Sequence, residues 1–361
     1  MIATENELQA VLPSIAAAPW IALDTEADSL HSYPEKLCLI QLSFPGQDIL
    51  VDPLAGVNLA PLFTALSGRE ILLHGSDYDL RLLRRTFNFI PTAIFDTMLA
   101  ARLLGIEEFG LTHLVSRFLG IALSKSSQRA NWSQRPLTEK MYTYAQEDSR
   151  HLHALSSKLR AELEAVGRLD WHKETCDALI RDATAPPIED PDGDWRLKGV
   201  ERLSRRGQAV ARELWHWREA EATALNRPPF FLLAHDTLLD LADAATSDRP
   251  VEPLIPKRYP PHRKHSIRKA IEAGLQIPVD EWPMPRRHRG RPLTMRQKEE
   301  LERLRVHRDA EATRLGLNPS LVASKATLTQ LAKDWEGSQE LLLNWQRSIL
   351  AAAKPAPAST P

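Results

Sequence analysis

The sequence lacks several features that would place it in familiar classes of protein. It has only two cysteines, Cys38 and Cys176, which excludes a disulfide framework and a cysteine-rich zinc site. No apolar stretch reaches the roughly 18 residues that a membrane span needs. The opening MIATENELQA has neither the basic nor the apolar block of a secretory signal. We therefore expect a soluble, cytoplasmic protein that contacts no membrane.

Several catalytic motifs are also missing. The chain has no glycine-rich phosphate loop and no Gly-x-Ser-x-Gly elbow, which argues against P-loop and serine-hydrolase chemistry. Its histidines have no metal-ligand spacing with the cysteines, and the acids of LDTEADS are not followed by the pattern of a calcium loop. The chemistry must therefore come from other residues.

The length, the hydrophobic content and the distribution of charge are informative. A chain of 361 residues that is 43% hydrophobic suits two or three domains with real cores. Residues 1–189 contain 24 acidic and 17 basic side chains, whereas the remainder contains 23 acidic and 29 basic ones. This asymmetry is consistent with metal-binding carboxylates in the first part and a phosphate-seeking surface in the second.

The first part has the pattern of an α/β domain. Apolar runs predict strands and periodic segments predict helices, with helical periodicity dominating from residue 77 onward. One long helix is expected after Pro136, with Thr138 as its N-cap. The expected strands are 19–25, 37–44, 48–53 and 70–75, and a helix is expected at 59–67.

An internal repeat follows a proline-rich, acidic linker. REAEATAL at 218–225 recurs as RDAEATRL at 308–315, and the same offset of 90 relates Pro229 to Pro319 and Leu241 to Leu331. This repeat predicts two copies of one small helical module. The expected boundaries are a first domain at 1–182, a linker at 183–194, helical copies at 195–277 and 295–354 around a basic linker at 278–294, and a disordered tail at 355–361.

Acidic side chains occur in three places on the expected elements. Asp24 and Glu26 are two apart on a strand, so they lie on one face, where like charges repel unless a cation or a proton lies between them. Asp79 comes near the start of a helix, and Tyr144 and Asp148 are four apart on the long helix. Taken singly, these residues could equally be a polar strand end, an acid that complements a helix dipole and a surface pair.

Together, LDTE, HGSDYD and YAQED resemble the three motifs of the DEDD exonucleases, in the variant with Tyr in the third motif, whose members have a ribonuclease H-like fold. YPEKLCLIQLS, VDPL, IFDTMLAARLLG and NWSQRPLT resemble connecting segments of the ribonuclease D family, over about residues 18–175. The repeats resemble the helicase and ribonuclease D C-terminal (HRDC) module. The resemblance implies an α/β ribonuclease H-like exonuclease domain followed by two all-α HRDC-type domains.

The resemblance also implies an activity and a set of site residues. The expected activity is metal-dependent 3′ to 5′ trimming of structured RNA such as tRNA precursors, with release of nucleoside 5′-monophosphates. Asp24, Glu26, Asp79 and Asp148 would be the ligands of two Mg²⁺ or Mn²⁺ ions, and Tyr144 would orient or deprotonate the attacking water.

The physical chemistry of the residues agrees with this expectation. Four converging carboxylates would be unstable as bare anions, but two cations about 3.5 to 4 Å apart would neutralise them and clamp the reacting oxygens. Tyrosine, with a pKa of about 10, is a poor base at neutral pH, so we expect Tyr144 to position the water. The chain departs from the family by having Gln146 and Glu147 in the third motif; Glu147 should project about 100° from Asp148 and lie outside the cluster.

Two further segments are candidates for RNA contacts. Lys125, Gln128, Trp132 and Arg135 precede the long helix and could hold a phosphate or a terminal base, or could be a solvated loop with one packed Trp. Residues 257–308 contain 15 basic and 6 acidic side chains, which favours contact with RNA phosphates over a merely solvated face.

Two alternatives remain for the function. One is a DNA 3′ to 5′ exonuclease of the same superfamily, because the ribose contacts that select RNA are not visible in motifs. The other is a non-catalytic nucleic-acid-binding protein that acts through its HRDC modules. That alternative predicts a broken catalytic set, whereas all five positions are filled. We expect a monomer.

Overall fold

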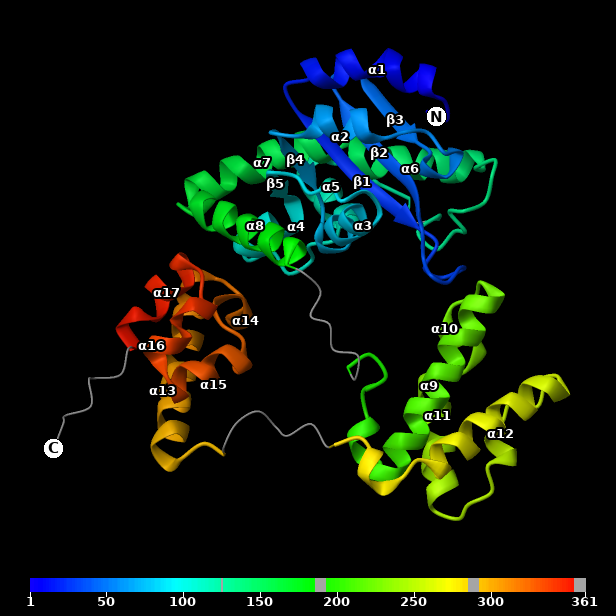
Figure 1. Ribbon diagram of the computed structural model, residues 1–361. Helices are drawn as coiled ribbons and strands as arrows, with labels where there is room; N and C mark the ends of the chain where they lie inside the picture. Colours follow the sequence, from blue (N-terminus) through cyan, green and yellow to red (C-terminus); the bar gives the residue numbers. More distant parts are fainter. Residues whose placement is uncertain (125, 186–192, 285–291, 354–361) are drawn as a thin grey trace. The chain divides into compact units, whose positions relative to one another are not determined.

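The computed structural model describes residues 1–124, 126–185, 193–284 and 292–353 (Figure 1). The chain divides into two compact units. The first unit contains Met1–Ala27, Leu37–Ala185 and the C-terminal segment from Pro292, and the second contains Asp28–Lys36 and Pro186–Arg291. Within the described ranges, no helix combines the length and the apolar character that crossing a bilayer requires.

A five-stranded mixed sheet forms the centre of the first unit, with strand order β3-β2-β1-β4-β5. The first three strands are antiparallel neighbours, and β4 and β5 run parallel to β1. This arrangement places β1 in the middle of the sheet. The strands are β1 (Ile21–Ala27), β2 (Leu37–Phe44), β3 (Gln47–Val51), β4 (Glu70–Leu73) and β5 (Ala93–Asp96).

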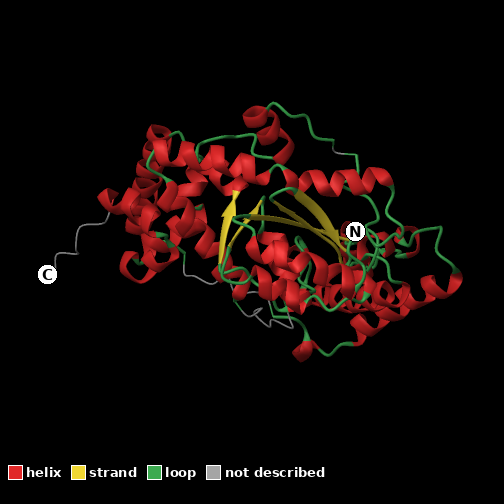
Figure 2. Ribbon diagram, turned by 90° about the horizontal axis from the view of Figure 1, so that it is seen from above, coloured by secondary structure: helices red, strands yellow, loops and turns green. Residues whose placement is uncertain are grey.

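Helices cover both faces of this sheet (Figure 2). Side chains alternate along β1, so Ile21 and Leu23 pack in one apolar cluster with α1, α2 and α3, whereas Ala22 packs in another with α4, α5 and α7. The helices are α1 (Glu5–Ala17), α2 (Ala60–Leu66), α3 (Asp77–Phe87), α4 (Thr97–Leu103), α5 (Leu111–Leu119), α6 (Glu139–Arg150), α7 (Leu152–Ala165) and α8 (Leu169–Thr184).

The predicted elements are confirmed with two corrections. The four expected strands and the helix at 59–67 are present within a few residues. The strand β5 was not predicted, because three apolar residues followed by Asp96 show no period that distinguishes a strand from a helix. The long helix is two helices, α6 and α7, which meet at His151; Thr138 does cap the first of them by accepting a hydrogen bond from the Met141 amide.

The first helices of the two helical copies are related by the predicted offset. The long helices α9 (Arg205–Leu225) and α13 (Met295–Leu315) both have 21 residues and start 90 positions apart. The short helices α10 (Pro229–Leu232) and α14 (Pro319–Val322) keep this offset. The remaining helices are α11 (His235–Thr246), α12 (Pro261–Gln276), α15 (Lys325–Lys333), α16 (Trp335–Ser338) and α17 (Asn344–Leu350).

The second helical copy packs within the first unit. Trp345 of α17 stacks on Trp171 of α8 with 4.9 Å between ring centroids, and the Glu174 carboxylate accepts hydrogen bonds from the Asn344 and Trp345 amides. A single apolar cluster includes residues of α4, α5 and α7 together with residues of α13 to α17. The domain boundaries drawn from the sequence remain a prediction. The expected tail and parts of both linkers lie outside the described residues.

Candidate active site

The central strand β1 presents Asp24 and Glu26 on the sheet face that α6 covers. In the antiparallel register Asp24 lies opposite Gln41 of β2, and both neighbouring residues on that face, Ala22 and Ser43, are fully buried. The strand therefore starts as core and ends with two partly exposed carboxylates, as the alternation in the sequence predicted.

Asp79 reaches the site from the other side of β1. It lies in the first turn of α3, which begins just after β4, the parallel neighbour of β1. Its side chain is 6% exposed and accepts a hydrogen bond from the Thr25 hydroxyl. Thr25 stands between Asp24 and Glu26 and faces the α3 side, so it ties the first acidic motif to the second. This role of Thr25 was not predicted, although its position within LDTE was a usable signal.

The helix α6 is anchored to the antiparallel part of the sheet. The Ser149 and Ser43 hydroxyls are hydrogen-bonded at 2.8 Å, which holds the helix on β2. The Gln146 amide donates to the Asp48 carbonyl, and the Arg150 guanidinium pairs with the Asp48 carboxylate at 2.6 Å, which holds it on β3. Gln146, which departs from the family motif, is therefore a structural contact here.

This anchoring brings the third motif to the first. One carboxylate oxygen each from Asp24, Glu26 and Asp148 lie within 4.8 Å of one another, close enough for a single metal ion to bind all three. Glu147 is not part of this group, as expected from its position on the helix. Asp79 is also outside this group of three, but its charge raises the pKa of both Asp24 and Glu26.

The carboxyls of the cluster resist ionisation. Burial, followed by the charges of Asp148 and Asp79, raises the pKa of Glu26 to about 9. Burial, followed by the charges of its three acidic neighbours, raises the pKa of Asp24 well above its usual range. Burial also raises the pKa of Asp79 and of Asp148 to about 7, although hydrogen bonding to Thr25 and to Tyr144 works in the opposite direction. A cation would relieve this unfavourable accumulation of charge.

Tyr144 stands one helical turn before Asp148, and its hydroxyl hydrogen-bonds that carboxylate. Burial, followed by the charge of Asp148, raises the pKa of Tyr144 well above its usual value of about 10. The hydroxyl is therefore a proton donor at neutral pH in this arrangement. Its oxygen can accept a hydrogen bond from a water molecule and orient it, which favours the positioning role over that of a base.

Asp96 supports the second motif from the end of β5. It is fully buried, and its carboxylate accepts hydrogen bonds from the Gly75 amide and from the Ser76 amide and hydroxyl. It also caps α4 through the amides of Met98 and Leu99. Asp96 thus fixes the turn from which α3 presents Asp79. This role of Asp96 was not predicted, since an acid before a helix is usually only a cap.

Two of the predicted substrate-binding residues have other roles. Trp132 is 1% exposed and packs beside Tyr144, with 6.0 Å between ring centroids, so it has no face available for a base. The Arg135 guanidinium pairs with both oxygens of Asp52 at 2.6 Å and donates to three backbone carbonyls, so its donors are already used. Gln128 is exposed, and Lys125 lies outside the described residues.

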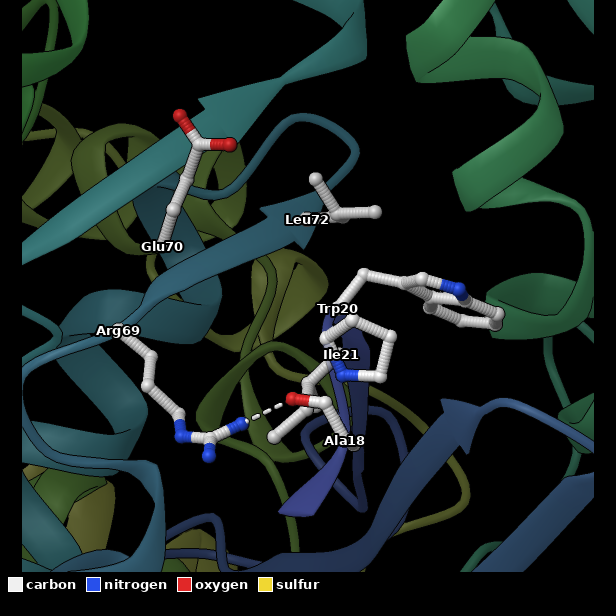
Figure 3. A pocket seen from close by; sticks show the side chains of 7 residues that line it. Ala18, Trp20, Ile21, Arg69, Glu70 and Leu72 are labelled. Carbon is white, nitrogen blue, oxygen red and sulfur yellow. Dashed lines mark hydrogen bonds between the residues drawn. The ribbon is translucent and has the colours of Figure 1, made fainter. Parts of the chain in front are cut away.

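A cavity of about 320 Å³ lies at the opposite end of β1, near Ile21 (Figure 3). Its charged groups are engaged: Arg69 donates to the Ala18 carbonyl, and Glu70 pairs with Arg160 at 2.7 Å. Trp20, which also lines it, stacks on His153. The cavity therefore offers no free group for chemistry, and the acidic end of β1 remains the candidate active site.

Comparison with known proteins agrees with this geometry. Residues 1–164 match the family described as 3′-5′ exonuclease, and residues 207–248 match the HRDC domain. The chain is 31% identical to a ribonuclease D of Gluconacetobacter diazotrophicus over 97% of this chain and 90% of the relative.

Two solved structures share the fold over nearly the whole chain. A protein from Bifidobacterium adolescentis has a TM-score of 0.81 at 25% identity, covering 98% of this chain and 95% of that one. Escherichia coli RNase D, described as an exoribonuclease involved in structured RNA processing, has a TM-score of 0.75 at 25% identity, covering 98% of this chain and 96% of its own. The chain belongs to the ribonuclease D family and is a 3′-5′ exoribonuclease.

Proposed function

We propose that this exoribonuclease trims the 3′ ends of structured RNAs, including tRNA precursors, with two divalent ions held by Asp24, Glu26, Asp79 and Asp148. The observation that carries the proposal is the grouping of three carboxylate oxygens within 4.8 Å, with Asp79 close behind them. The ions would be Mg²⁺ or Mn²⁺, because all the protein ligands are hard oxygens.

The residues fit such ions by two further criteria. All four carboxyls have a raised pKa, so the site is unfavourable as a set of anions and gains from added positive charge. The Gln41 amide, opposite Asp24 in the sheet, is fully buried and makes no hydrogen bond among the described residues. A buried amide of this kind is favourable only when a ligand or an ordered water satisfies it.

The reaction would be the hydrolysis of the last phosphodiester. A water molecule forms the new bond to phosphorus, the bond to the 3′ oxygen breaks, and a nucleoside 5′-monophosphate leaves while the shortened RNA keeps a 3′-hydroxyl. Divalent ions, when bound, neutralise the charge that develops on the phosphate. The Tyr144 hydroxyl would donate its proton to Asp148, which holds it in place, and its oxygen would accept a hydrogen bond from the water and so orient it.

Digestion of end-labelled RNA tests this proposal. A structured RNA with a free 3′ end should lose nucleotides one at a time in Mg²⁺ or Mn²⁺, a 3′ block should protect it, and a 5′ block should not. Asp77→Asn should digest the RNA as the unmodified chain does, and it is a matched control for substitution of Asp79. Asp77 is an exposed acid on the same helix and pairs with Arg81. Cutting of circular RNA, or equal digestion without divalent ions, would contradict the proposal.

The same assay separates the alternatives. Equal or faster digestion of a DNA strand of the same sequence would favour the DNA exonuclease, and binding without any hydrolysis would favour the non-catalytic alternative. We further propose that the protein acts as a monomer in the cytoplasm, which light scattering and cell fractionation can test.

A further inference from the structure

The second unit has a groove of about 560 Å³ whose walls combine arginine and aromatic side chains. It is formed where α9 ends, along α10, and at the turn that leads into α12. Arg227, Phe231, Arg258, Tyr259 and Arg263 all line it. None of these residues belongs to the exonuclease motifs, so the groove needs a separate explanation.

The positive charge of this groove is only partly compensated. Arg263 faces Glu221 at 3.4 Å, and its guanidinium also lies over the Tyr259 ring at 5.4 Å. The Arg258 guanidinium also lies over the Tyr259 ring, at 5.9 Å from its centroid. Across the described part of the chain, neither Arg227 nor Arg258 pairs with a carboxylate. The groove therefore has two cations available for an anion.

Two phenylalanines of α10 are unusually exposed for their size, whereas Tyr259 is buried. Phe231 is 54% exposed and Phe230 is 51% exposed, and their rings lie 4.6 Å apart. Two adjacent exposed phenylalanines expose apolar surface that folding does not require. Exposed rings beside unpaired arginines are the combination that binds single-stranded nucleic acid, since bases stack on the rings and phosphates pair with the cations.

The second helical copy provides an internal comparison. Its long and short helices repeat those of the first copy at an offset of 90, but the chemistry of the groove is not repeated. Leu317 is buried, and Leu321 packs on the apolar cluster of the first unit. The two positions are therefore packed in the second copy, whereas the corresponding side chains of the first copy, Arg227 and Phe231, are exposed. The first copy has Arg227, Phe230 and Phe231 where the second has Leu317, Ser320 and Leu321.

We propose that this groove binds a single-stranded segment of RNA, with a base stacked on Phe231 and the adjoining phosphates held by Arg227 and Arg258. The inference goes beyond the catalytic site and takes from the proposed function only that the partner is RNA. The groove reads base faces and phosphates, so it favours unpaired nucleotides over a particular sequence.

Binding of a fluorescent single-stranded oligouridine to the full chain tests the groove. The measurement uses EDTA, so that no hydrolysis occurs. Phe231→Leu and Arg227→Leu install the residues of the second copy. Phe231→Leu should weaken binding about tenfold with an unchanged salt dependence, because it removes stacking alone. Arg227→Leu should weaken binding and lower the slope of log affinity against log salt by about 0.7.

Matched substitutions in the same unit control for general effects. Val279 is 61% exposed, and Arg249 is exposed and pairs with Asp243, so Val279→Ala and Arg249→Gln should leave binding unchanged. Circular dichroism and the melting temperature verify that each variant is folded, and Arg258→Gln replaces any variant that is not. A fully paired hairpin without an overhang should bind less tightly than the oligouridine and should be insensitive to Phe231→Leu.

The binding measurements can contradict the proposal for the groove while leaving the proposal for the catalytic site unaffected. If the folded groove variants bind the oligouridine within about twofold of the unmodified chain, the groove is a solvated surface or a docking site for another protein, and the inference is wrong. If the chain fails to hydrolyse RNA but these variants still lose affinity, the catalytic proposal fails and the groove stands.

Discussion

Metal binding to the acidic site should be strongly dependent on pH, and the structure allows the size of the effect to be worked out. The pKa of Glu26 is raised to about 9, so at pH 7 this carboxyl is protonated in the metal-free protein. A metal ion needs the carboxylate, and removing its proton at pH 7 costs about 3 kcal/mol, from two pH units at about 1.36 kcal/mol each. This cost falls as the pH approaches 9.

Affinity for Mn²⁺ should therefore rise about tenfold per pH unit between pH 6 and 8 from Glu26 alone. Asp79 and Asp148, with pKa values raised to about 7, should steepen the rise below pH 7. Titration calorimetry on the full chain, in pairs of buffers that differ in ionisation enthalpy, measures both the affinity and the number of protons released. We expect the release of at least one proton per binding event at pH 7.

Glu26→Gln should lower the number of protons released on Mn²⁺ binding by about one. It should also lower the slope of log affinity against pH by about one. Asp77→Asn should change neither quantity, because Asp77 is exposed and lies outside the cluster. An affinity that stays constant from pH 6 to 8, or binding that releases no proton, would show that the carboxyls are already ionised in the metal-free protein and would refute the reasoning.

Four further outcomes can be measured independently. Asp24→Asn should abolish RNA hydrolysis without lowering the melting temperature, because it removes a ligand and also a source of repulsion; retention of more than half of the activity would exclude Asp24 as a ligand. Tyr144→Phe should leave metal binding intact and slow single-turnover hydrolysis about 100-fold, through misplacement of the water; an unchanged rate would remove the tyrosine from the mechanism. Asp96→Ala should destabilise the protein by about 3–5 kcal/mol in urea unfolding and raise the metal concentration needed for half-maximal activity, because several buried donors lose their acceptor. Trp345→Ala should lower the free energy of unfolding by about 3–5 kcal/mol and lower the melting temperature of the whole first unit in calorimetry. A separate transition at lower temperature would mean that the second copy unfolds alone.

Much of the geometry of the candidate site could be predicted because it is local. The alternation of strand side chains puts Asp24 and Glu26 on one face, and the helical period puts Tyr144 and Asp148 on one face. Both relations depend only on a few consecutive residues. The strand and the helix that carry them had strong patterns, so the side-chain directions followed directly.

The errors came from residues whose roles depend on distant partners. Arg135 appeared free for phosphate because its partner, Asp52, is 83 positions away. Trp132 appeared available for stacking because nothing in the neighbouring sequence shows that it is buried beside Tyr144. Thr25 and Asp96 were overlooked for the same reason, since each acts on a helix formed elsewhere in the chain.

The anchoring of α6 to β2 and β3 has a consequence for how the protein acquires activity. Asp24 and Asp148 are 124 positions apart, and they meet only when Ser149 and Arg150 have docked on strands formed much earlier in the chain. Contacts between such distant segments form late and slowly in folding. During synthesis or refolding, the chain should therefore remain inactive until α6 docks. Nuclease activity then reports that α6 has docked on the sheet, and a partly folded chain in which α6 has not docked cannot degrade RNA.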